Sequence, residues 1–357
     1  MITDNYIKKR DGIGSMFHDI ALEAHAIDTI PIEMDYTLFY TGRQAVKYIL
    51  ETIKENHNIE KIWMPSYYCQ HVTRWIKKVY TNLHFYDINP FEFHSAVDVN
   101  SFASKNDVVL INNYWGLSDG FSKTADSPII IEDHSHGWLT KNCMKSKADY
   151  CFVSLRKTLP IPLGGICWKP NAKMETAKNH FIDDPKFYDV FDRLHLAMKA
   201  KYDYKKGTTQ IEKTGYLKVM EDTEDFLDAN HEIISVRPQD VRLLETYLPL
   251  NFLAHKAANL NLLYQHIQPT PLIQIIKRPD YTSFGLLLLL KEQSLWASLR
   301  NQLIENEIYP SFLWPDNKSL PELGYVLNIH VDFRYHAIDM VYIANTINDW
   351  IRFNTKA

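Results

Sequence analysis

SLRKTLPIPLGG, residues 154–165, stands between two short apolar runs. The run before it, Tyr150–Val153, and the run after it, Ile166–Trp168, both predict buried strands. The two prolines prevent a helix from continuing past Lys157, because proline lacks the N–H that a helix interior requires. The stretch therefore predicts a strand that ends in a polar turn carrying a lysine, with a second strand after the two glycines.

Similar apolar runs recur earlier in the chain and alternate with helical or loop segments. After Thr41 and Gly42, apolar residues recur at helical spacing from Ala45 to Ile53. This alternation is typical of a mainly parallel sheet with helices on both faces. We therefore predict a large α/β domain over residues 1–240, with the N-terminal segment included. Its other strands are predicted over Lys61–Met64, Leu83–Ile88, Val108–Asn112 and Ile129–Ile131.

The pattern changes after residue 240. Val241–Ile267 is helical in its spacing, and Ile338–Ile351 predicts a closing helix. We expect a smaller α+β domain over residues 241–357. Between these two helices the sequence predicts strands over Leu272–Ile276, Phe284–Leu290 and Val326–Val331, and a helix over Leu295–Glu305.

Composition excludes several classes of partner. Acidic residues outnumber basic ones by 43 to 39, which argues against binding to nucleic acid, since that requires a basic surface. The longest purely apolar run, Leu286–Leu290, is too short to cross a membrane. The four cysteines show neither paired nor metal-type spacing, and residues 1–17 lack the apolar core of a signal peptide. We expect a cytoplasmic protein with reduced cysteines, no resident metal and no membrane or nucleic-acid partner.

Polar and aromatic residues follow the ends of several predicted strands. In an open parallel α/β sheet, ligands bind beyond the carboxyl ends of the strands. A helix start such as Thr41–Arg43 also favours an anion, because its N–H groups are free. Together these segments predict one site at one edge of the sheet. The residues that follow the strands are Ser66–Tyr68, Asn112–Tyr114, Glu132–His136 and Ser154–Lys157.

One interpretation makes Ser154 the nucleophile of a serine acyl-enzyme. Ser154 and Lys157 form a Ser-x-x-Lys motif, and Lys213-Thr214-Gly215 supplies the Lys-Thr-Gly of that enzyme class. The motif needs both side chains on one helical face, which the prolines oppose. The Ser-x-Asn that should stand between the two motifs is missing.

A second interpretation is a metal site. His134-x-His136, with Asp133 and Glu132 beside it, offers donors that suit zinc. A third protein ligand is not recognisable at any typical spacing.

A third interpretation makes Lys157 an imine-forming lysine that holds pyridoxal phosphate, which then serves as an electron sink. That chemistry also needs a carboxylate for the pyridine nitrogen, an anion cradle for the phosphate and a flat group against the ring. Asp133 could supply the carboxylate, and Thr41-Gly42 with Ser154 the cradle. The flat group could be Tyr67, Tyr68 or His136.

Taken in order, the segments resemble the DegT/StrS-like family of fold-type I aminotransferases, which act on nucleotide-linked keto sugars. The resemblance covers residues 38–350 and depends on the order and near-family spacing of several motifs. It implies a large, mainly parallel sheet of the seven-stranded type with a smaller C-terminal domain. The matching segments are TGRQAV at 41, WMPSYYC at 63, NNYWG at 112, IEDHSHG at 131, FVSLRKTLPIPLGG at 152, ISVRPQD at 234, IYPSFLWP at 308 and HVDFRYHAIDM at 330.

The resemblance assigns roles to individual residues. It implies that Lys157 carries the cofactor, Asp133 pairs with the pyridine nitrogen, Ser154 binds the phosphate and His136 lies near the ring. It also implies a homodimer with sites at the interface, in which Arg237 reaches the neighbouring subunit's phosphate. The catalytic residues are then Lys157 and Asp133. The implied cofactor-binding set is Thr41, Gly42, Arg43, Tyr67, Tyr68, Asn113, Asp133, His136, Ser154, Lys157 and Arg237.

The implied reaction moves an amino group from glutamate or glutamine to a keto sugar. The acceptor would be a nucleotide-linked keto-deoxysugar used in surface polysaccharide or related biosynthesis. Three departures mark a divergent member: Lys157 follows Ser154 by three positions rather than five, Leu163 precedes Gly-Gly, and Ser235 replaces asparagine. The common ring-stacking position also falls on Cys69. Dehydratase-like chemistry on a sugar and a cofactor-less binding homologue are the alternatives, although the known dehydratase branch has histidine in place of the lysine.

Overall fold

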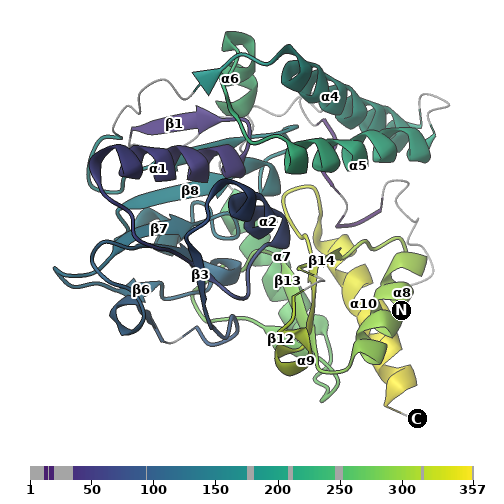
Figure 1. Cartoon of the computed structure of the whole chain (residues 1–357). Coiled ribbons are helices and arrows are strands. Elements are labelled where there is room, and N and C mark those ends of the chain that lie inside the picture. Colours follow the sequence, from purple (N-terminus) through teal and green to yellow (C-terminus); the bar gives the residue numbers. More distant parts are fainter. Residues whose placement is uncertain are drawn as a thin grey trace. The chain divides into compact units, whose positions relative to one another are not determined.

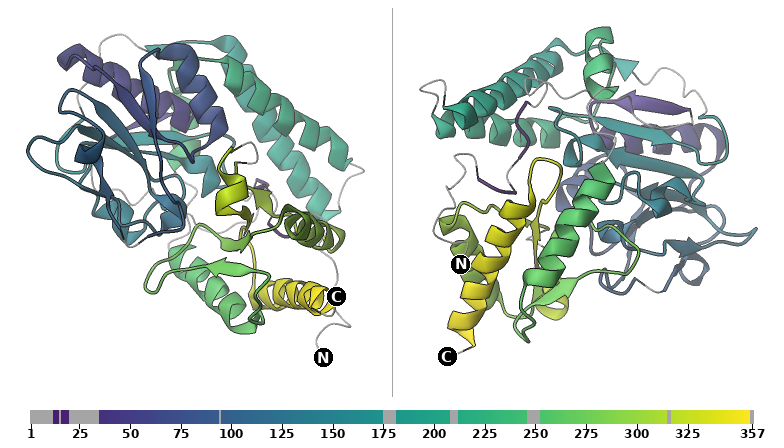
Figure 2. Two further views of the ribbon diagram at one scale, coloured as in Figure 1. Left: turned by 60° about the horizontal axis from the view of Figure 1, so that its bottom comes forward. Right: turned by 180° about the vertical axis from the view of Figure 1, so that it is seen from behind.

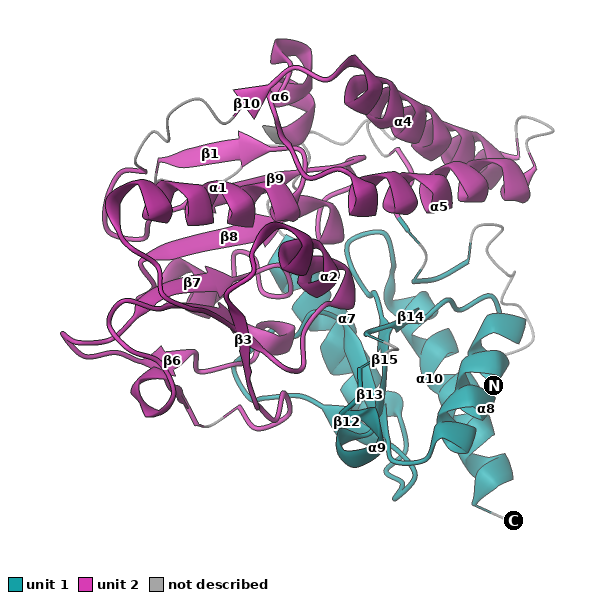
Figure 3. Cartoon of the chain, in the orientation of Figure 1, with its two compact units in different colours: residues 1–16, 249–357 teal, residues 17–248 magenta. Residues whose placement is uncertain are grey.

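The structure is a computed structural model that describes residues 12–14, 16–19, 35–93, 95–174, 181–207, 212–245, 252–314 and 317–355 (Figure 1). The chain divides into two units, coloured separately in Figure 3. Unit 2 comprises Phe17–Leu248, and unit 1 comprises Met1–Met16 with Pro249–Ala357. The sequence placed the N-terminal segment with the large domain and the boundary at residue 240. Ile13, however, forms a parallel bridge with Ile308 and belongs to the core of unit 1.

Unit 2 is built around a seven-stranded sheet in the order β1-β9-β8-β7-β5-β2-β3. The four pairings from β8 through β7, β5 and β2 to β3 are parallel, while β9 is antiparallel to both β8 and β1. The predicted fold class, a fold-type I arrangement with a large mainly parallel sheet, is confirmed. The strands are β1 (Tyr36–Phe39), β2 (Ile62–Pro65), β3 (Leu83–Tyr86), β5 (Val108–Asn112), β7 (Ile129–Asp133), β8 (Tyr150–Ser154) and β9 (Gly165–Trp168).

Two helices pack on one face of this sheet. α1 (Gly42–Asn56) begins at Thr41, whose hydroxyl caps it by accepting the N–H of Gln44 at 3.1 Å. α2 (Gln70–Val79) follows β2 and buries Trp75 and Ile76. Both helices share a core with the alternate side chains of the strands. The start of α1 thereby lies against the end of β8 and the beginning of β9.

The parallel strands end where the sequence changes from apolar to polar residues. β7 extends through Asp133 and β8 through Ser154, two and one residues beyond the predicted ends. β9 begins at the second glycine of the Gly-Gly pair, Gly165. The polar residues expected to lie in loops therefore occupy the last positions of the strands themselves.

Short elements connect these strands: β4 (Val97–Asp98), η3 (Val99–Ser101), η4 (Tyr114–Gly116), β6 (Phe121–Ser122), α3 (Lys141–Met144) and η5 (Leu155–Lys157). The last of these, η5, contains Lys157 and is a 3-10 turn rather than an α-helix.

Two long helices, α4 (Pro185–Lys206) and α5 (Lys213–Ala229), lie side by side in unit 2. Asp184 caps α4 by accepting two N–H groups, and Gly207 ends it with a left-handed φ of 67°. β10 (Phe181–Ile182) pairs with β11 (Ile233–Ile234), and α6 (Pro238–Glu245) follows. The long helix predicted over residues 241–267 is observed as α6 and α7, with residues 246–251 outside the described part of the chain.

Unit 1 contains an antiparallel sheet in the order β12-β13-β15-β14. Helices α7 and α10 lie side by side and pack into its core with α8 (Figure 2). Its elements are α7 (Phe252–His266), β12 (Gln274–Ile276), β13 (Leu286–Leu290), α8 (Gln293–Glu305), β14 (Ser311–Phe312), α9 (Leu320–Leu323), β15 (Tyr325–Ile329) and α10 (Ala337–Asn354). Among the described helices, none is long and apolar enough to cross a membrane.

Candidate active site

Asp133 is the last residue of β7 and is almost fully buried. Its Oδ2 accepts a hydrogen bond from the Tyr68 hydroxyl at 2.5 Å, and its Oδ1 accepts the N–H of Ser135 at 2.8 Å. Both oxygens are therefore held in place, and each keeps a lone pair for a further donor. A carboxylate fixed in this way can stabilise a cationic ring nitrogen.

Tyr67 and Tyr68 follow β2, and both are buried. Burial, together with Asp133, raises the pKa of Tyr68 well above its ordinary value, so the phenol stays protonated and donates. Tyr67 instead packs within 6.5 Å, between ring centroids, of Phe91, Tyr114 and Trp115. The sequence did not indicate that Tyr68 bonds Asp133, and the ring-stacking role expected of either tyrosine stays a prediction.

Lys157 ends the 3-10 turn η5 and is partly buried. The turn is closed by the Thr158 N–H, which donates to the Leu155 carbonyl at 2.9 Å, and the Leu155 N–H donates to the Gly164 carbonyl at 2.9 Å. Within the described part of the chain, the Lys157 ammonium makes no hydrogen bond or ion pair with protein. An amine on a fixed turn without a protein partner is available to a ligand.

A tight backbone contact brings Thr41, Gly42, Ser154 and Gly165 together. A Cβ on Gly42 would lie 3.1 Å from the Ser154 Cβ, and a Cβ on Gly165 would lie 2.5 Å from the Thr41 carbonyl carbon. Only glycine allows these segments to approach so closely. The Ser154 side chain is thereby held beside the N-terminus of α1, where backbone N–H groups favour an anion. The structure thus joins the predicted cradle residues.

Arg43 and Arg156 turn toward α5. Arg43 forms a 3.0 Å ion pair with Asp228, and Arg156 forms a bidentate pair with Glu224. Burial lowers the pKa of Arg43, and the neighbouring Arg156 lowers it further. These two arginines beside the cradle are thus tied to a helix whose role the sequence did not reveal.

Asn113 and His136 complete the predicted set on this edge of the sheet. The Asn113 side-chain amide lies 3.2 Å from Nδ1 of His134, and the Asn113 backbone N–H donates to the Asp133 carbonyl. The His136 ring stacks on Trp115, with ring centroids 5.4 Å apart and planes at 10°. Trp115 has a left-handed φ of 58°, which is rare for a bulky side chain and marks local strain.

Arg237 lies at the start of α6 and is engaged within its own chain. Its guanidinium pairs with Asp192 through two nitrogens, at 3.0 and 2.5 Å, and its Nε pairs with Asp240 at 2.6 Å. It also stacks 4.9 Å from the centroid of the Tyr188 ring. The predicted contact with a neighbouring subunit stays a prediction.

The structure contradicts the acyl-enzyme interpretation. Ser154 ends a strand and Lys157 lies in a 3-10 turn, so the two do not share a helical face. Lys213-Thr214-Gly215 forms the first turn of α5 rather than a strand. The proposed pair of histidines is separated as well: His134 stacks on Trp168 and His136 on Trp115.

Comparisons with known proteins identify the fold. No family model matches the chain, and no curated protein sequence matches it. Several solved structures match it. The sugar aminotransferase CalS13 from Micromonospora echinospora matches over 95% of this chain and 98% of its own, with a TM-score of 0.55 and 11% identity. The PLP-form of Spr1654 from Streptococcus pneumoniae matches over 96% and 99%, with a TM-score of 0.55 and 11% identity.

DesI, solved in the presence of its TDP-sugar product, matches over 90% of this chain and 82% of its own, with a TM-score of 0.53 and 11% identity. The chain has the fold of these proteins. At such low identity the likeness establishes the fold alone.

Proposed function

We propose that this protein is a pyridoxal-phosphate-dependent aminotransferase of the DegT/StrS-like type. The observation that supports it is that one edge of a fold-type I sheet carries a fixed carboxylate, an anion cradle and a turn with Lys157, whose ammonium has no protein partner among the described residues. Lys157, Asp133 and the Thr41–Gly42 segment come from three separate parts of the chain. No single motif would carry the proposal, but their combination meets the requirements of this cofactor.

The residues present fit the cofactor. Lys157 would hold it covalently, and Asp133 would pair with the ring nitrogen. The phosphate would lie against Thr41, Gly42 and Ser154, where a side chain at Gly165 would close the space. When bound, the cofactor stabilises the electron pair released at the amino-acid carbon.

The chain's own residues then direct the chemistry. Once free, Lys157 would accept the proton of the donor carbon at its Nζ as general base and deliver it to the cofactor carbon as general acid. Asp133, fixed by Tyr68 and Ser135, would keep the ring nitrogen protonated. The stacked rings of Trp115 and His136 are buried, so they would exclude water from part of this edge of the sheet.

The substrate assignment rests on likeness. CalS13 is a sugar aminotransferase, and DesI was solved with a TDP-sugar product. We therefore propose a nucleotide-linked keto sugar as acceptor, for surface polysaccharide or related biosynthesis, and glutamate or glutamine as donor. The four cysteines are free, which suits the cytoplasm as the place of action.

The proposal includes a homodimer with sites at the interface. In the single chain the Arg237 side chain is 18% exposed, and its partner Asp192 is 55% exposed. Because this pair lies at the surface, Arg237 can exchange Asp192 for an anion on a neighbouring subunit at modest cost.

The test is direct. Purified protein is incubated with pyridoxal phosphate and desalted, and its visible spectrum is recorded. Borohydride then fixes any lysine–cofactor linkage, and peptide mapping locates it. We expect a retained absorption band and the label on Lys157. Lys157→Ala should lose both, and Lys157→Arg, which keeps the positive charge, should lose them equally.

The outcomes separate the alternatives. A retained band without amino transfer to any keto-sugar nucleotide would favour dehydratase-like chemistry at the same site. No retained band in a folded protein would overturn the enzyme assignment and favour a binding homologue without cofactor. A label on another lysine would overturn the role of Lys157.

A further inference from the structure

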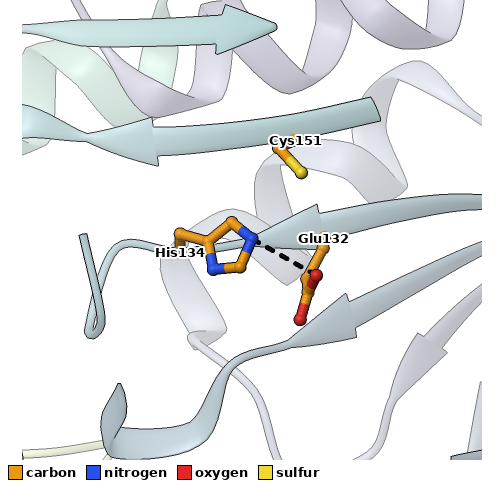
Figure 4. A group of neighbouring side chains, drawn as sticks. All are labelled: Glu132, His134 and Cys151. Atoms are coloured by element: carbon orange, nitrogen blue, oxygen red, sulfur yellow. Dashed lines mark ion pairs between the residues drawn. The ribbon is translucent and has the colours of Figure 1, made fainter. Parts of the chain in front are cut away.

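Three side chains with donor atoms that can bind a metal lie together beside strands β7 and β8. Glu132 on β7 and Cys151 on β8 are direct register partners, and His134 follows Glu132 by two residues. Because side chains alternate along a strand, all three fall on the same face of the sheet. Figure 4 shows the three side chains converging on one point between the strands.

The distances suit a single ion. One donor atom from each side chain lies within 4.8 Å of the other two. Nε2 of His134 lies 3.2 Å from Oε2 of Glu132. Ligands at about 2.0 to 2.3 Å from tetrahedral zinc are separated by roughly 3 to 4 Å, so small side-chain movements would complete the geometry.

The His134 side chain has an ion pair but no hydrogen bond at Nε2. Its ring is fully buried, and Nε2 lies 3.2 Å from Oε2 of Glu132, outside hydrogen-bond geometry. Its Nδ1 contacts the Asn113 amide at 3.2 Å, and the Asn113 Oδ1 is itself buried without a hydrogen bond. With the amide turned over, Oδ1 would accept the Nδ1–H. Metal-bound histidines typically have such a partner, which leaves the Nε2 lone pair for the ion.

Charge balance also favours a divalent cation. Cys151 and Glu132 are both almost fully buried, so a negative charge on either side chain has little water to stabilise it. A divalent ion with one carboxylate, one thiolate and one neutral imidazole has no net charge, so the burial that disfavours a bare thiolate would no longer do so.

A cavity of about 150 Å³ reaches one side chain of the cluster, because it is lined by Glu132, together with Ser146 and Asn142 among others. The Ser146 hydroxyl lies 2.5 Å from Oε2 of Glu132 and 3.3 Å from Sγ of Cys151. Water in this cavity could therefore reach a fourth position on the ion.

We propose that Glu132, His134 and Cys151 form a binding site for one zinc ion, with water from the adjacent cavity as the fourth ligand. The mixed nitrogen, sulfur and oxygen donors suit zinc rather than magnesium or calcium. On binding, the Cys151 thiol releases its proton to solvent. The ion would join β7 to β8, the strands that end in Asp133 and Ser154. This site does not depend on the proposed function.

The test uses the full chain without an affinity tag. Protein is loaded with zinc, dialysed extensively, and analysed for metal content. We expect about one zinc per chain. Replacement by cobalt should give thiolate-to-cobalt charge transfer and the visible bands of a tetrahedral ion. Cys151→Ser should abolish the charge-transfer band, and His134→Gln should lower the zinc content at least tenfold.

Cys167→Ser is the matched control. Cys167 is buried on the neighbouring strand β9 but lies outside the cluster, so this variant should bind metal like the wild type. A wild-type chain that retains no zinc overturns the proposal. Zinc binding that Cys151→Ser and Cys167→Ser affect equally overturns it as well. Because the wild-type measurement needs no variant, poor folding of a variant cannot leave the proposal untested.

Discussion

The Tyr68 hydroxyl donates a 2.5 Å hydrogen bond to Oδ2 of Asp133, although the two residues are 65 positions apart. The bond joins the end of β2 to the end of β7, across the intervening strand β5. Burial and the neighbouring Asp133 raise the pKa of Tyr68 well above its ordinary value, so the phenol keeps the proton that it donates. Tyr68 therefore fixes the orientation of the carboxylate assigned to the ring nitrogen.

Replacing Tyr68 with phenylalanine removes this bond and keeps the aromatic volume. A hydrogen bond to a charged group contributes about 1.5 to 3 kcal/mol, so the dissociation constant for pyridoxal phosphate should rise about tenfold or more. Titration of the cofactor-free protein, followed by absorbance, measures it. Tyr67→Phe is the matched control, because Tyr67 is the adjacent buried tyrosine and packs against aromatic rings. Equal affinities for the two variants would contradict the role of Tyr68.

Gly165→Ala should damage the anion cradle. The added methyl would lie 2.5 Å from the Thr41 carbonyl oxygen and 2.7 Å from the Gly42 nitrogen, so the backbone must move. Overpacking of this kind costs about 1 to 3 kcal/mol of stability, and displacement of the α1 start should also weaken phosphate binding. Denaturant unfolding and titration with inorganic phosphate test both effects.

Gly215→Ala provides the comparison for that variant. Apart from its own helix backbone and chain neighbours, no atom of the described residues lies within 4 Å of the position of its added methyl, and Gly215 lies in the first turn of helix α5. Alanine there should stabilise the protein by up to about 1 kcal/mol and leave phosphate binding unchanged. If Gly165→Ala also kept its stability and its phosphate binding, the tight contact between Gly165 and Thr41 would be contradicted.

The role of Arg237 can be tested by replacing either residue of its ion pair with Asp192. Arg237→Gln and Asp192→Asn break the same bidentate contact. If Arg237 also reaches a cofactor phosphate on a neighbouring subunit, only Arg237→Gln should weaken cofactor binding, by about tenfold. Sedimentation analysis establishes the oligomeric state of each variant. Equal affinities in two dimeric variants would show that Arg237 acts only within its own chain.

Much of the fold was predictable because its determinants are local. The runs over Lys61–Met64, Val108–Asn112, Ile129–Ile131 and Tyr150–Val153 predicted strands that the structure contains, and the polar residues after them predicted the edge at which a ligand would bind. The boundary shifts of one or two residues have a different cause, which is not local. Asp133 and Ser154 extend strands because their neighbours pair, and the sequence alone does not show this pairing.

The missed features all depend on contacts between distant residues. Nothing near Arg43 or Arg156 indicates that α5 supplies their carboxylates, because Glu224 and Asp228 lie far along the chain. The sequence did not indicate Cys151 as a possible metal ligand, because its proposed partners are also distant in sequence. Its spacing from His134 in sequence is not a metal motif, and the strand register brings the two together.

Lys256 of α7 offers a test of unit 1. Its side chain is 8% exposed, and the ammonium has no ion pair within the described residues. Burial lowers its pKa to about 8, although Asp332 opposes the shift. In the unfolded chain the pKa would return to the ordinary value of 10.5. Below pH 8, keeping this charge in the folded protein therefore costs stability, on the order of 3 kcal/mol.

Lys256→Met should consequently raise the free energy of unfolding by about 2 to 3 kcal/mol near neutral pH. Between pH 8 and 10.5 the unfolded chain binds more protons at this residue than the folded one, so the stability of the wild type rises with pH. The advantage of the variant should shrink over that interval. Denaturant unfolding at about pH 7 and about pH 10 measures the change. Lys318→Met, at an exposed lysine of the same unit, should show neither effect. A Lys256→Met protein that is less stable at neutral pH would mean that the ammonium has a buried partner.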